Sequence, residues 1–463
     1  MTPARPNEHD AVASPSTPAP VAESQSTKAK GRGSRREFIR ESSLLMAGGT
    51  LAAQLSISRS AHAFGSDLIK IGMIGCGSRG TGAASEALNT KGSTRLVALA
   101  DVFPDSIAKC LRGLSRHSEQ LDVPPERQFA GFDGFKGVLQ SDCDLVILST
   151  PPGYRPMHFE AAVQANKHVF MEKPVAVDVP GAKRILAATE EARRRNLAVA
   201  VGLQRHHEPR YVETVKRLQD GAIGDILLAR AYWNSGGVFV RPRQAEQTEL
   251  EYQLRNWYYF NWLCGDHIVE QHIHNLDVIN WIKNAYPVEA NGQGGRQVRT
   301  GLDYGQIFDH HFVEYTYADG TKLFSQCRHI VNTWNSVSEH VHGINGSCNV
   351  SNFTIKDRQG NTTWKYGGGG GEGHQQEHHD LFASLRNGEI PNEGEYGAMS
   401  TMTAILGRMA TYSGQAVTME EALKSEHQWA DLTKLTSVQD PAPILPGKDG
   451  RYEVATPGIT PPV

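Results

Sequence analysis

The sequence of 463 residues has little cysteine, no long apolar run and no excess of positive charge. Its six cysteines are widely spread and form no CxxC pair, which argues against a zinc ribbon or a thioredoxin-like redox site. No apolar run reaches the roughly 18 residues of a membrane span. Lys and Arg number 47 against 50 Asp and Glu, which argues against nucleic acid as a partner.

What is present indicates a soluble globular protein of about two or three domains. Hydrophobic residues make up 39% of the chain and charged residues 21%, which suits a protein with a sizeable core. Residues 1–33 are rich in Pro, Ala, Ser and Thr and cannot bury enough apolar surface to fold, so we expect a disordered extension. Residues 426–463 predict a Pro-rich C-terminal tail.

Residues 34–63 have the pattern of a signal peptide. A basic start with Arg35-Arg36 precedes a short apolar stretch, and Ala61-His62-Ala63 is a small-x-small cleavage site. The paired arginines resemble a twin-arginine signal. That route exports folded proteins, so we expect an exported or periplasmic protein that uses this machinery and holds its cofactor tightly.

The next segment has the fingerprint of a dinucleotide site. Residues 68–74 predict a buried strand and residues 81–88 a helix, joined by Gly75-Cys76-Gly77-Ser78-Arg79-Gly80. Gly75 permits the tight turn, Gly77 lets the backbone approach a pyrophosphate, and Gly80 lets the helix pack on the strand. The helix N-terminus then faces the negative charge.

A carboxylate in the following strand favours NAD over NADP. Residues 96–100 predict this strand, and Asp101 ends it about 20 residues after Gly80, where a carboxylate would bind the ribose hydroxyls and repel a 2′-phosphate. Arg79 could reach a 2′-phosphate, or it could be solvated or face the pyrophosphate.

Further strands alternate with helical stretches, which predicts a parallel, doubly wound sheet over residues 64–201. The predicted strands are 145–148, 168–171 and 198–201, with a helix over 181–196. Ligands gather at the carboxyl ends of such strands. We therefore expect a site at those ends, formed by Asp101, Thr150, Pro151, Glu172 and Lys173.

These motifs together resemble the glucose–fructose oxidoreductase / inositol dehydrogenase / rhizopine-catabolism (Gfo/Idh/MocA) family over roughly residues 66–425. The resemblance rests on the glycine loop, Asp101, and then on Ser149-Thr150-Pro151-Pro152 with His158, Glu172-Lys173-Pro174, and Gly202-Leu203-Gln204-Arg205. It implies a Rossmann domain followed by an α/β domain with a large, mostly antiparallel open sheet, here residues 202–425. It also implies an NAD(P)-dependent oxidoreductase of sugars, cyclitols or related polyols, often in homo-oligomers packed through that sheet.

The resemblance also implies roles for single residues. Lys173 would reach the nicotinamide ribose and the reacting oxygen, where an ammonium stabilises developing negative charge. Glu172 would orient Lys173, and Gln204 would approach the nicotinamide end. The expected cofactor-binding residues are Gly75, Gly77, Ser78, Arg79, Gly80, Asp101, Thr150, Pro151, His158, Glu172, Lys173 and Gln204.

Residues 264–282 predict a helix with a buried face and carry the remaining chemistry. Glu270 and His274 are four positions apart, so on one helix they share a face, and an imidazole oriented by a carboxylate is a sound general base. Many relatives have Asp in place of Glu270 and Gly-Gly before it, whereas this chain has Cys264-Gly265-Asp266. We expect Lys173, His274 and Glu270 to be catalytic.

Several alternatives stay open from the sequence. His267 and His272, with Glu270 and His274, could bind a metal, although we expect none. The cluster of His374, His378 and His379 is more typical of a solvated helix start than of a ligand set. Besides an oxidoreductase, the chain could be a glycoside-cleaving enzyme that uses bound NAD transiently, or a binding protein on a degenerate fold.

Overall fold

The computed structural model describes residues 67–463, which form a single unit by their internal contacts. The predicted extension at 1–33 and signal peptide at 34–63 lie outside the described residues. Within the described part, no helix combines the length and the apolar character needed to cross a bilayer.

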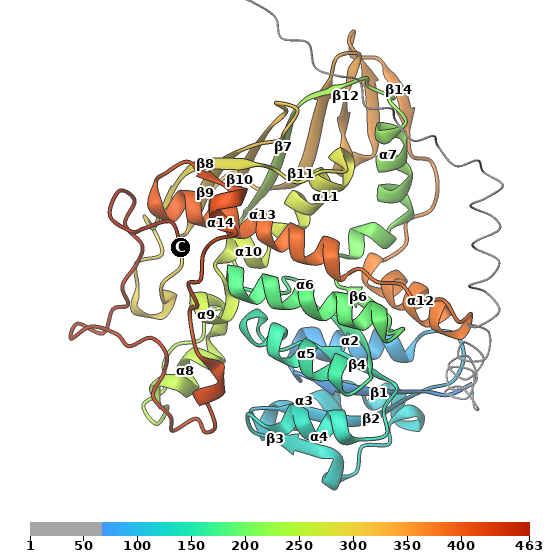
Figure 1. Ribbon diagram of the computed structural model, residues 1–463, viewed down its shortest axis with the longest axis vertical. Helices are drawn as coiled ribbons and strands as arrows, with labels where there is room; N and C mark the ends of the chain where they lie inside the picture. Colours follow the sequence, from blue (N-terminus) through green and yellow to red (C-terminus); the bar gives the residue numbers. More distant parts are fainter. Residues whose placement is uncertain (1–66) are drawn as a thin grey trace, which may run out of the picture. The chain divides into compact units, whose positions relative to one another are not determined.

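The first domain is built on a six-stranded parallel sheet in the order β3-β2-β1-β4-β5-β6. Every residue of β4 is buried, as expected of a parallel strand covered on both faces (Figure 1). The strands are β1 (Ile69–Ile74), β2 (Thr94–Asp101), β3 (Gln128–Ala130), β4 (Leu145–Leu148), β5 (His168–Met171) and β6 (Val199–Val201). The helices are α2 (Ser78–Leu88), α3 (Pro104–Gly113), α4 (Gly134–Gln140), α5 (Arg155–Gln164) and α6 (Val179–Arg194).

The strand order reverses between β1 and β4, which are hydrogen-bonded neighbours. In open α/β sheets this switch point opens a crevice at the carboxyl ends of the strands.

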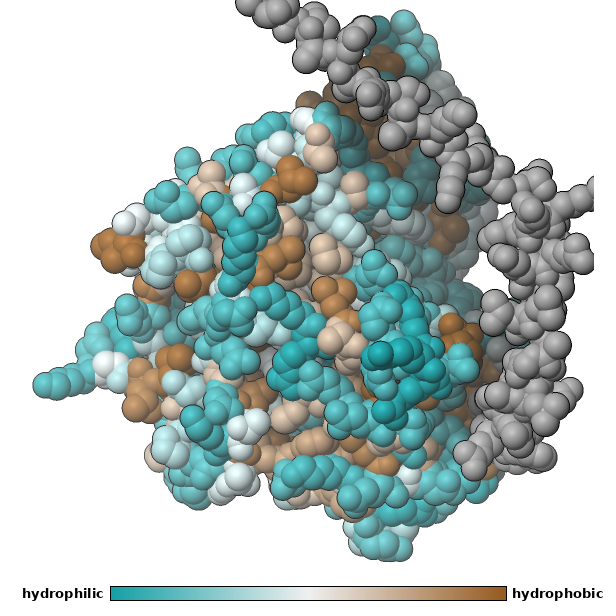
Figure 2. All heavy atoms as spheres, in the orientation of Figure 1, coloured by the Kyte–Doolittle hydropathy of each residue, from teal (hydrophilic) through white to brown (hydrophobic). Residues whose placement is uncertain are grey.

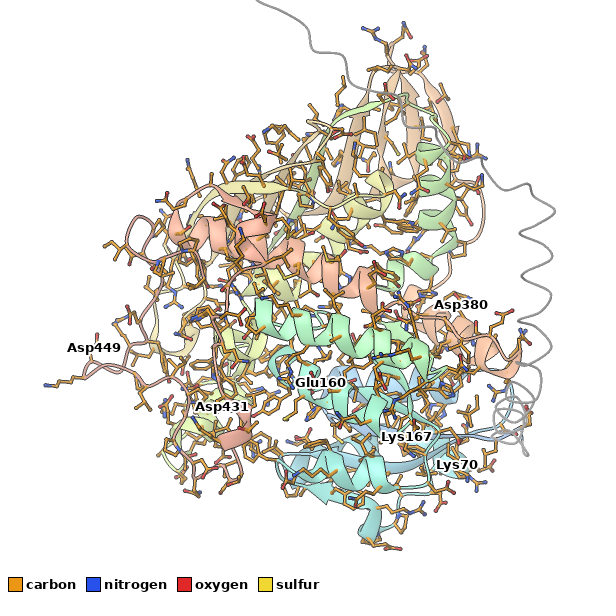
Figure 3. The ribbon with its side chains drawn as sticks, viewed as in Figure 1. Lys70, Glu160, Lys167, Asp380, Asp431 and Asp449 are labelled. Atoms are coloured by element: carbon orange, nitrogen blue, oxygen red, sulfur yellow. The ribbon has the colours of Figure 1, made fainter. Side chains whose placement is uncertain are left out.

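The packing of the helices is reinforced by ion pairs: Glu160 on α5, labelled in Figure 3, accepts from the Nε of Arg184 on α6 at 2.8 Å.

The second domain carries a nine-stranded sheet in the order β14-β13-β12-β11-β7-β10-β9-β8-β15. All its neighbouring strands are antiparallel except β7 and β10. The strands are β7 (Ile226–Ser235), β8 (Glu289–Gly295), β9 (His310–Thr316), β10 (Lys322–His329), β11 (Ser336–Gly343), β12 (Gly346–Asn349), β13 (Thr354–Asp357), β14 (Thr362–Lys365) and β15 (Val417–Thr418). The predicted fold class, a Rossmann domain followed by a mostly antiparallel sheet, is confirmed.

Helices cover one face of this second sheet and connect it to the first domain. The long helix α13 (Gly394–Ser413) contacts both β8 and α6, and α11 (Ile273–Lys283) contacts β7 (Figure 1). Figure 2 shows that the helix-bearing face is largely hydrophilic, with hydrophobic residues in small groups. The remaining helices are α7 (Pro209–Gln219), α8 (Glu249–Arg255), α9 (Asn261–Cys264), α10 (His267–Glu270), α11 (Ile273–Lys283), α12 (Gly373–Arg386) and α14 (Met419–Ala422).

The helix predicted over residues 264–282 is interrupted twice in the structure. Gly265 and Asp266 have φ angles of +77° and +76°, which end α9, and α10 stops at Glu270 before α11 begins at Ile273. The apolar pattern predicted burial correctly, but it could not show that the backbone turns twice within it.

The C-terminal segment, expected as a Pro-rich tail, packs against the second domain. Leu435, Ala442 and Tyr452 are buried in an aromatic cluster with Tyr252, Phe260 and Trp262. The ring of Tyr452 meets that of Phe260 edge-on at 4.9 Å. This segment therefore completes a core instead of extending away from the fold.

Candidate active site

The glycine loop between β1 and α2 forms the turn that the fingerprint requires. Gly75 has a φ of +102°, and a Cβ atom at Gly80 would lie 2.1 Å from the carbonyl oxygen of Gly75. A Cβ atom at Gly77 would meet no protein atom within 4 Å, yet Gly77 lines the cavity beside this loop. Glycine at 80 is therefore required by packing within the protein, whereas at Gly77 the space is left for a ligand.

Asp101 lies at the end of β2, beside the glycine loop. Its carboxylate accepts hydrogen bonds from the backbone nitrogens of Cys76, at 2.8 Å, and of Phe103, at 2.9 Å. Burial raises the pKa of Asp101 above its usual value. Since Asp101 lines the cavity and each oxygen keeps a free lone pair, the carboxylate can accept ribose hydroxyls.

The structure pairs Arg79 with two carboxylates. Its Nε lies 2.8 Å from Oε1 of Glu172, and its Nη2 donates to Glu86. A Cβ atom at Gly202 would lie 2.7 Å from the other oxygen of Glu172, so glycine makes room for this pair. Arg79 therefore links the glycine loop to the Glu172-Lys173-Pro174 loop, and its charge is matched without a 2′-phosphate.

The cavity beside these residues has a volume of about 370 Å³. Predicted cofactor residues on its wall are Gly75, Gly77, Ser78, Arg79, Asp101, Thr150, Pro151 and His158. The opposite wall comes from the second domain, through Phe239, Arg241, Leu254, Arg255 and Trp257. Glycine backbone, a carboxylate and aromatic walls suit the pyrophosphate, ribose and adenine of a dinucleotide.

Arg155 is a site residue that sequence reasoning missed. It is 1% exposed and donates to the carbonyl oxygens of Pro174, at 2.6 Å, and of Thr150, at 2.5 Å. It therefore fastens the loop after β5 to the loop after β4. An arginine that begins a helix resembles a surface residue in the sequence, so no signal pointed to this role.

His158 lies against Thr150 in the same wall. Its Nδ1 is 3.2 Å from the Thr150 hydroxyl oxygen, and burial lowers its pKa to about 3. The imidazole is therefore neutral at physiological pH and acts as a hydrogen-bonding and packing group.

Lys173 forms an ion pair with Glu270. The Lys173 Nζ lies 3.0 Å from Oε1 of Glu270 and also donates to the Glu270 backbone oxygen. Both side chains are 12% exposed. Among the described residues Glu270 has no hydrogen bond to His274. The structure therefore pairs Glu270 with Lys173, whereas from the sequence we expected it to orient His274.

His274 lies in the first turn of α11 and is buried against Trp233, with ring centroids 5.9 Å apart. Burial, together with the positive charges of Lys173 and Arg205, lowers the pKa of His274 well below its usual value. Arg205 also donates to the His274 backbone oxygen at 3.0 Å. The imidazole is therefore held in place and neutral, as a general base must be.

Glu172, Lys173, Gln204, Glu270 and His274 do not line the cavity itself. They form a second group of polar side chains, joined to the cavity through the Arg79–Glu172 pair. The buried Oε1 of Gln204 has no hydrogen-bond partner in the described part of the chain.

Helix α12 packs against α2 and the turn containing Gln204. Asp380 of α12, labelled in Figure 3, lies 2.7 Å from Nδ1 of His207 and ties the helix to that turn. A solvated start was expected at His374, His378 and His379, but His378 is fully buried, its ring 4.2 Å from Phe170.

Comparison with known proteins agrees with this architecture. Inositol 2-dehydrogenase from Pseudomonas fluorescens is 28% identical over 258 residues, which are 55% of this chain and 66% of that protein. The chain spans about half to two thirds of the length of the curated relatives it matches.

Two solved structures share the fold across both domains. One is scyllo-inositol dehydrogenase from Lactobacillus casei with bound NAD(H) and scyllo-inositol, at a TM-score of 0.59 and 20% identity. The other is aldose-aldose oxidoreductase from Caulobacter crescentus complexed with glycerol, at a TM-score of 0.59 and 18% identity. Each alignment covers 76% of this chain and 99% of the other.

A family model described as an oxidoreductase family with an NAD-binding Rossmann fold matches residues 69–202, the segment that contains the glycine loop, Asp101 and Lys173. Over this segment the chain is therefore similar to the Rossmann domain of the Gfo/Idh/MocA oxidoreductase family.

Proposed function

We propose that the protein is an NAD-dependent oxidoreductase acting on a CH–OH group of a sugar, cyclitol or related polyol. The observation that carries this proposal is a neutral His274, whose pKa is lowered by burial and by the positive charge of Lys173. Both residues belong to the group of polar side chains that the Arg79–Glu172 pair joins to the dinucleotide cavity. The names of the relatives, inositol dehydrogenases and an aldose oxidoreductase, support the substrate class. The glycoside-cleaving alternative has no support among those relatives.

The residues fit NAD, which would supply the hydride acceptor when bound. Gly77 and Ser78 would hold the pyrophosphate and Asp101 the adenosine ribose. Lys173 would hold the substrate oxygen through Nζ and stabilise negative charge as it develops there. His274 would take the hydroxyl proton on a ring nitrogen, and Glu270 would position Lys173 through their ion pair.

Single-turnover measurement of nicotinamide absorbance with candidate polyols tests this assignment. General acid–base catalysis contributes roughly 10²–10⁴-fold, so H274A should slow hydride transfer by about that factor. K173A should slow it at least as much, because charge stabilisation is also lost. E270Q should cost less, because the amide can still accept from Nζ.

Cofactor binding serves as the control for H274A and E270Q, since neither side chain lines the cavity. Bound cofactor at wild-type level with slow transfer would support the proposal. A near-wild-type rate in H274A would remove His274 from proton transfer.

We also propose that the protein is exported by the twin-arginine route with its cofactor bound. Arg35-Arg36 and Ala61-His62-Ala63 motivate this. Outside the cytoplasm no free NAD pool is expected, so a retained cofactor would have to be regenerated by a second substrate. Replacing both arginines with lysine should leave the precursor inside the cell, and NAD should be released from the exported protein only on denaturation. Unchanged export would contradict the first part.

Finally, we propose a homo-oligomer that packs through the outer face of the second sheet. Phe312 and Phe324 stack there with centroids 6.5 Å apart, and Trp334 is 61% exposed beside Tyr232. Light scattering should give a mass above one chain, and W334E with F312E should reduce it to one. A monomeric wild-type protein at micromolar concentration would contradict this.

A further inference from the structure

A buried group of potential metal ligands lies behind the candidate catalytic segment. Asp266 and His267 come from the turn into α10, and His311 from β9. One donor atom of each lies within 4.8 Å of the others, and all three residues are fully buried or nearly so. Of the metal ligands considered from the sequence, His267 belongs to this group, whereas Glu270 pairs with Lys173 and His272 contacts Ser325 at 2.7 Å.

The hydrogen bonds of His311 fix where its protons are. Its Nδ1 is 2.9 Å from the hydroxyl oxygen of Thr411, whose own proton is directed to the carbonyl oxygens of Gly407 and Arg408. When the hydroxyl donates to either carbonyl oxygen, it accepts from Nδ1 of His311, which then carries the proton. In a neutral His311 the lone pair of Nε2 then faces Oδ1 of Asp266 at 3.2 Å. Two acceptors in contact require a positive charge between them.

Asp266 accepts three hydrogen bonds, which indicates the anion and leaves a lone pair on Oδ1. Its carboxylate accepts from the Tyr412 hydroxyl at 2.6 Å, the Phe308 backbone nitrogen at 2.9 Å, and the His267 backbone nitrogen. The residue also adopts a φ of +76°, where a side chain is disfavoured. An anion buried in this way needs a nearby cation.

A proton between Asp266 and His311 would meet that need, but it would leave His267 unexplained. Neither ring nitrogen of His267 has a hydrogen-bond partner in the described structure, and the side chain is 0% exposed. Its Nε2 lies 3.8 Å from Oδ1 of Asp266, and its ring stacks on His329 at 4.2 Å. An unpaired buried imidazole is unfavourable, and a metal ion would use the donor atoms of all three residues at once.

We propose that Asp266, His267 and His311 bind one divalent transition-metal ion, for which Zn²⁺ is the best match. Two imidazoles and a carboxylate are a common zinc ligand set, with a fourth position for water. Ligand atoms about 2.0–2.1 Å from a tetrahedral ion lie roughly 3.3 Å apart, close to the 3.2 and 3.8 Å observed here.

The ion would fasten the turn before α10 to β9. Glu270 ends α10, so the ion would help to position the carboxylate that pairs with Lys173. Its role is therefore structural, behind the catalytic residues.

The test measures the metal content of the full chain purified without an affinity tag that binds metal. About one zinc ion per chain is expected, falling below roughly a tenth in H267A and in H311A. H340A, a histidine on β11 outside this group, should keep the wild-type content.

Because the variants could fail to fold, the wild-type protein provides a second readout. After chelation, Co²⁺ should produce the visible absorption of a tetrahedral site, which Zn²⁺ should abolish. Wild-type protein without bound metal and without this Co²⁺ signal would overturn the proposal and leave the proton-bridged pair. Metal retained in folded H267A and H311A would overturn it equally.

Discussion

At the scale of single residues, we expect Asp101 to decide which dinucleotide can bind. Its carboxylate lines the cavity, while Arg79 is already paired with Glu86 and Glu172. D101A should weaken NAD binding by about 1.5–3 kcal/mol, the worth of a hydrogen bond to a charged group, and should relax discrimination against NADP. Fluorescence titration with both dinucleotides checks this. A wild-type protein that prefers NADP would contradict the assignment.

A pair of glycines tests the cofactor loop at the scale of an element. G77A adds a methyl group where no protein atom lies within 4 Å, so the fold should keep its stability while NAD binding is lost. G80A forces a methyl group to 2.1 Å from the Gly75 carbonyl oxygen, so both stability and binding should fall. Thermal unfolding and calorimetric titration separate the two effects. Tight NAD binding by G77A would place the pyrophosphate elsewhere.

The C-terminal segment is a second element with a measurable role. Leu435 and Tyr452 are buried beside Leu254, which lines the dinucleotide cavity. Deleting residues 429–463 should therefore lower the free energy of unfolding by at least about 3 kcal/mol and weaken NAD binding. Deleting only 459–463, where Ile459 is 80% exposed, is the matched control and should change neither. Equal stability of the two truncated proteins would show that the packing is unimportant.

At the scale of the whole molecule, buried neutral histidines make stability depend on pH. Burial lowers the pKa of His158 to about 3 and of His168 to about 4, and it lowers the pKa of His274 and His378 well below the usual 6.5. Below pH 6.5 the unfolded chain binds protons that the folded protein does not. Each histidine should therefore lower the free energy of unfolding by up to about 1.4 kcal/mol per pH unit.

Three carboxyl groups oppose this trend, because burial raises the pKa of Asp101, Asp144 and Glu377. The histidines with a lowered pKa outnumber these carboxyl groups, so a net loss is expected between pH 6.5 and 5. Urea unfolding at pH 7 and pH 5 measures it, and H168N, which removes one of the titrating groups, should reduce the difference. Equal stability at the two pH values would contradict the neutral state of these side chains.

The sequence by itself determined the Rossmann strands, the glycine loop, Asp101 and the position of Lys173. Each depends on residues close together in the chain: β4 and β5 have the predicted bounds, and a strand that runs into a glycine turn leaves little choice of geometry. The hairpin of β9 and β10 was predictable for the same reason.

Only the tertiary structure decided which side chains meet across the domains. Lys173 and Glu270 are 97 positions apart, and their pairing depends on the two breaks that separate α9, α10 and α11. The same breaks bring Asp266 to His311 and place Glu270 away from His274. Spacing along a chain predicts neighbours only while the backbone stays regular, and left-handed residues such as Asp266 change its direction in a way that apolar periodicity does not reveal.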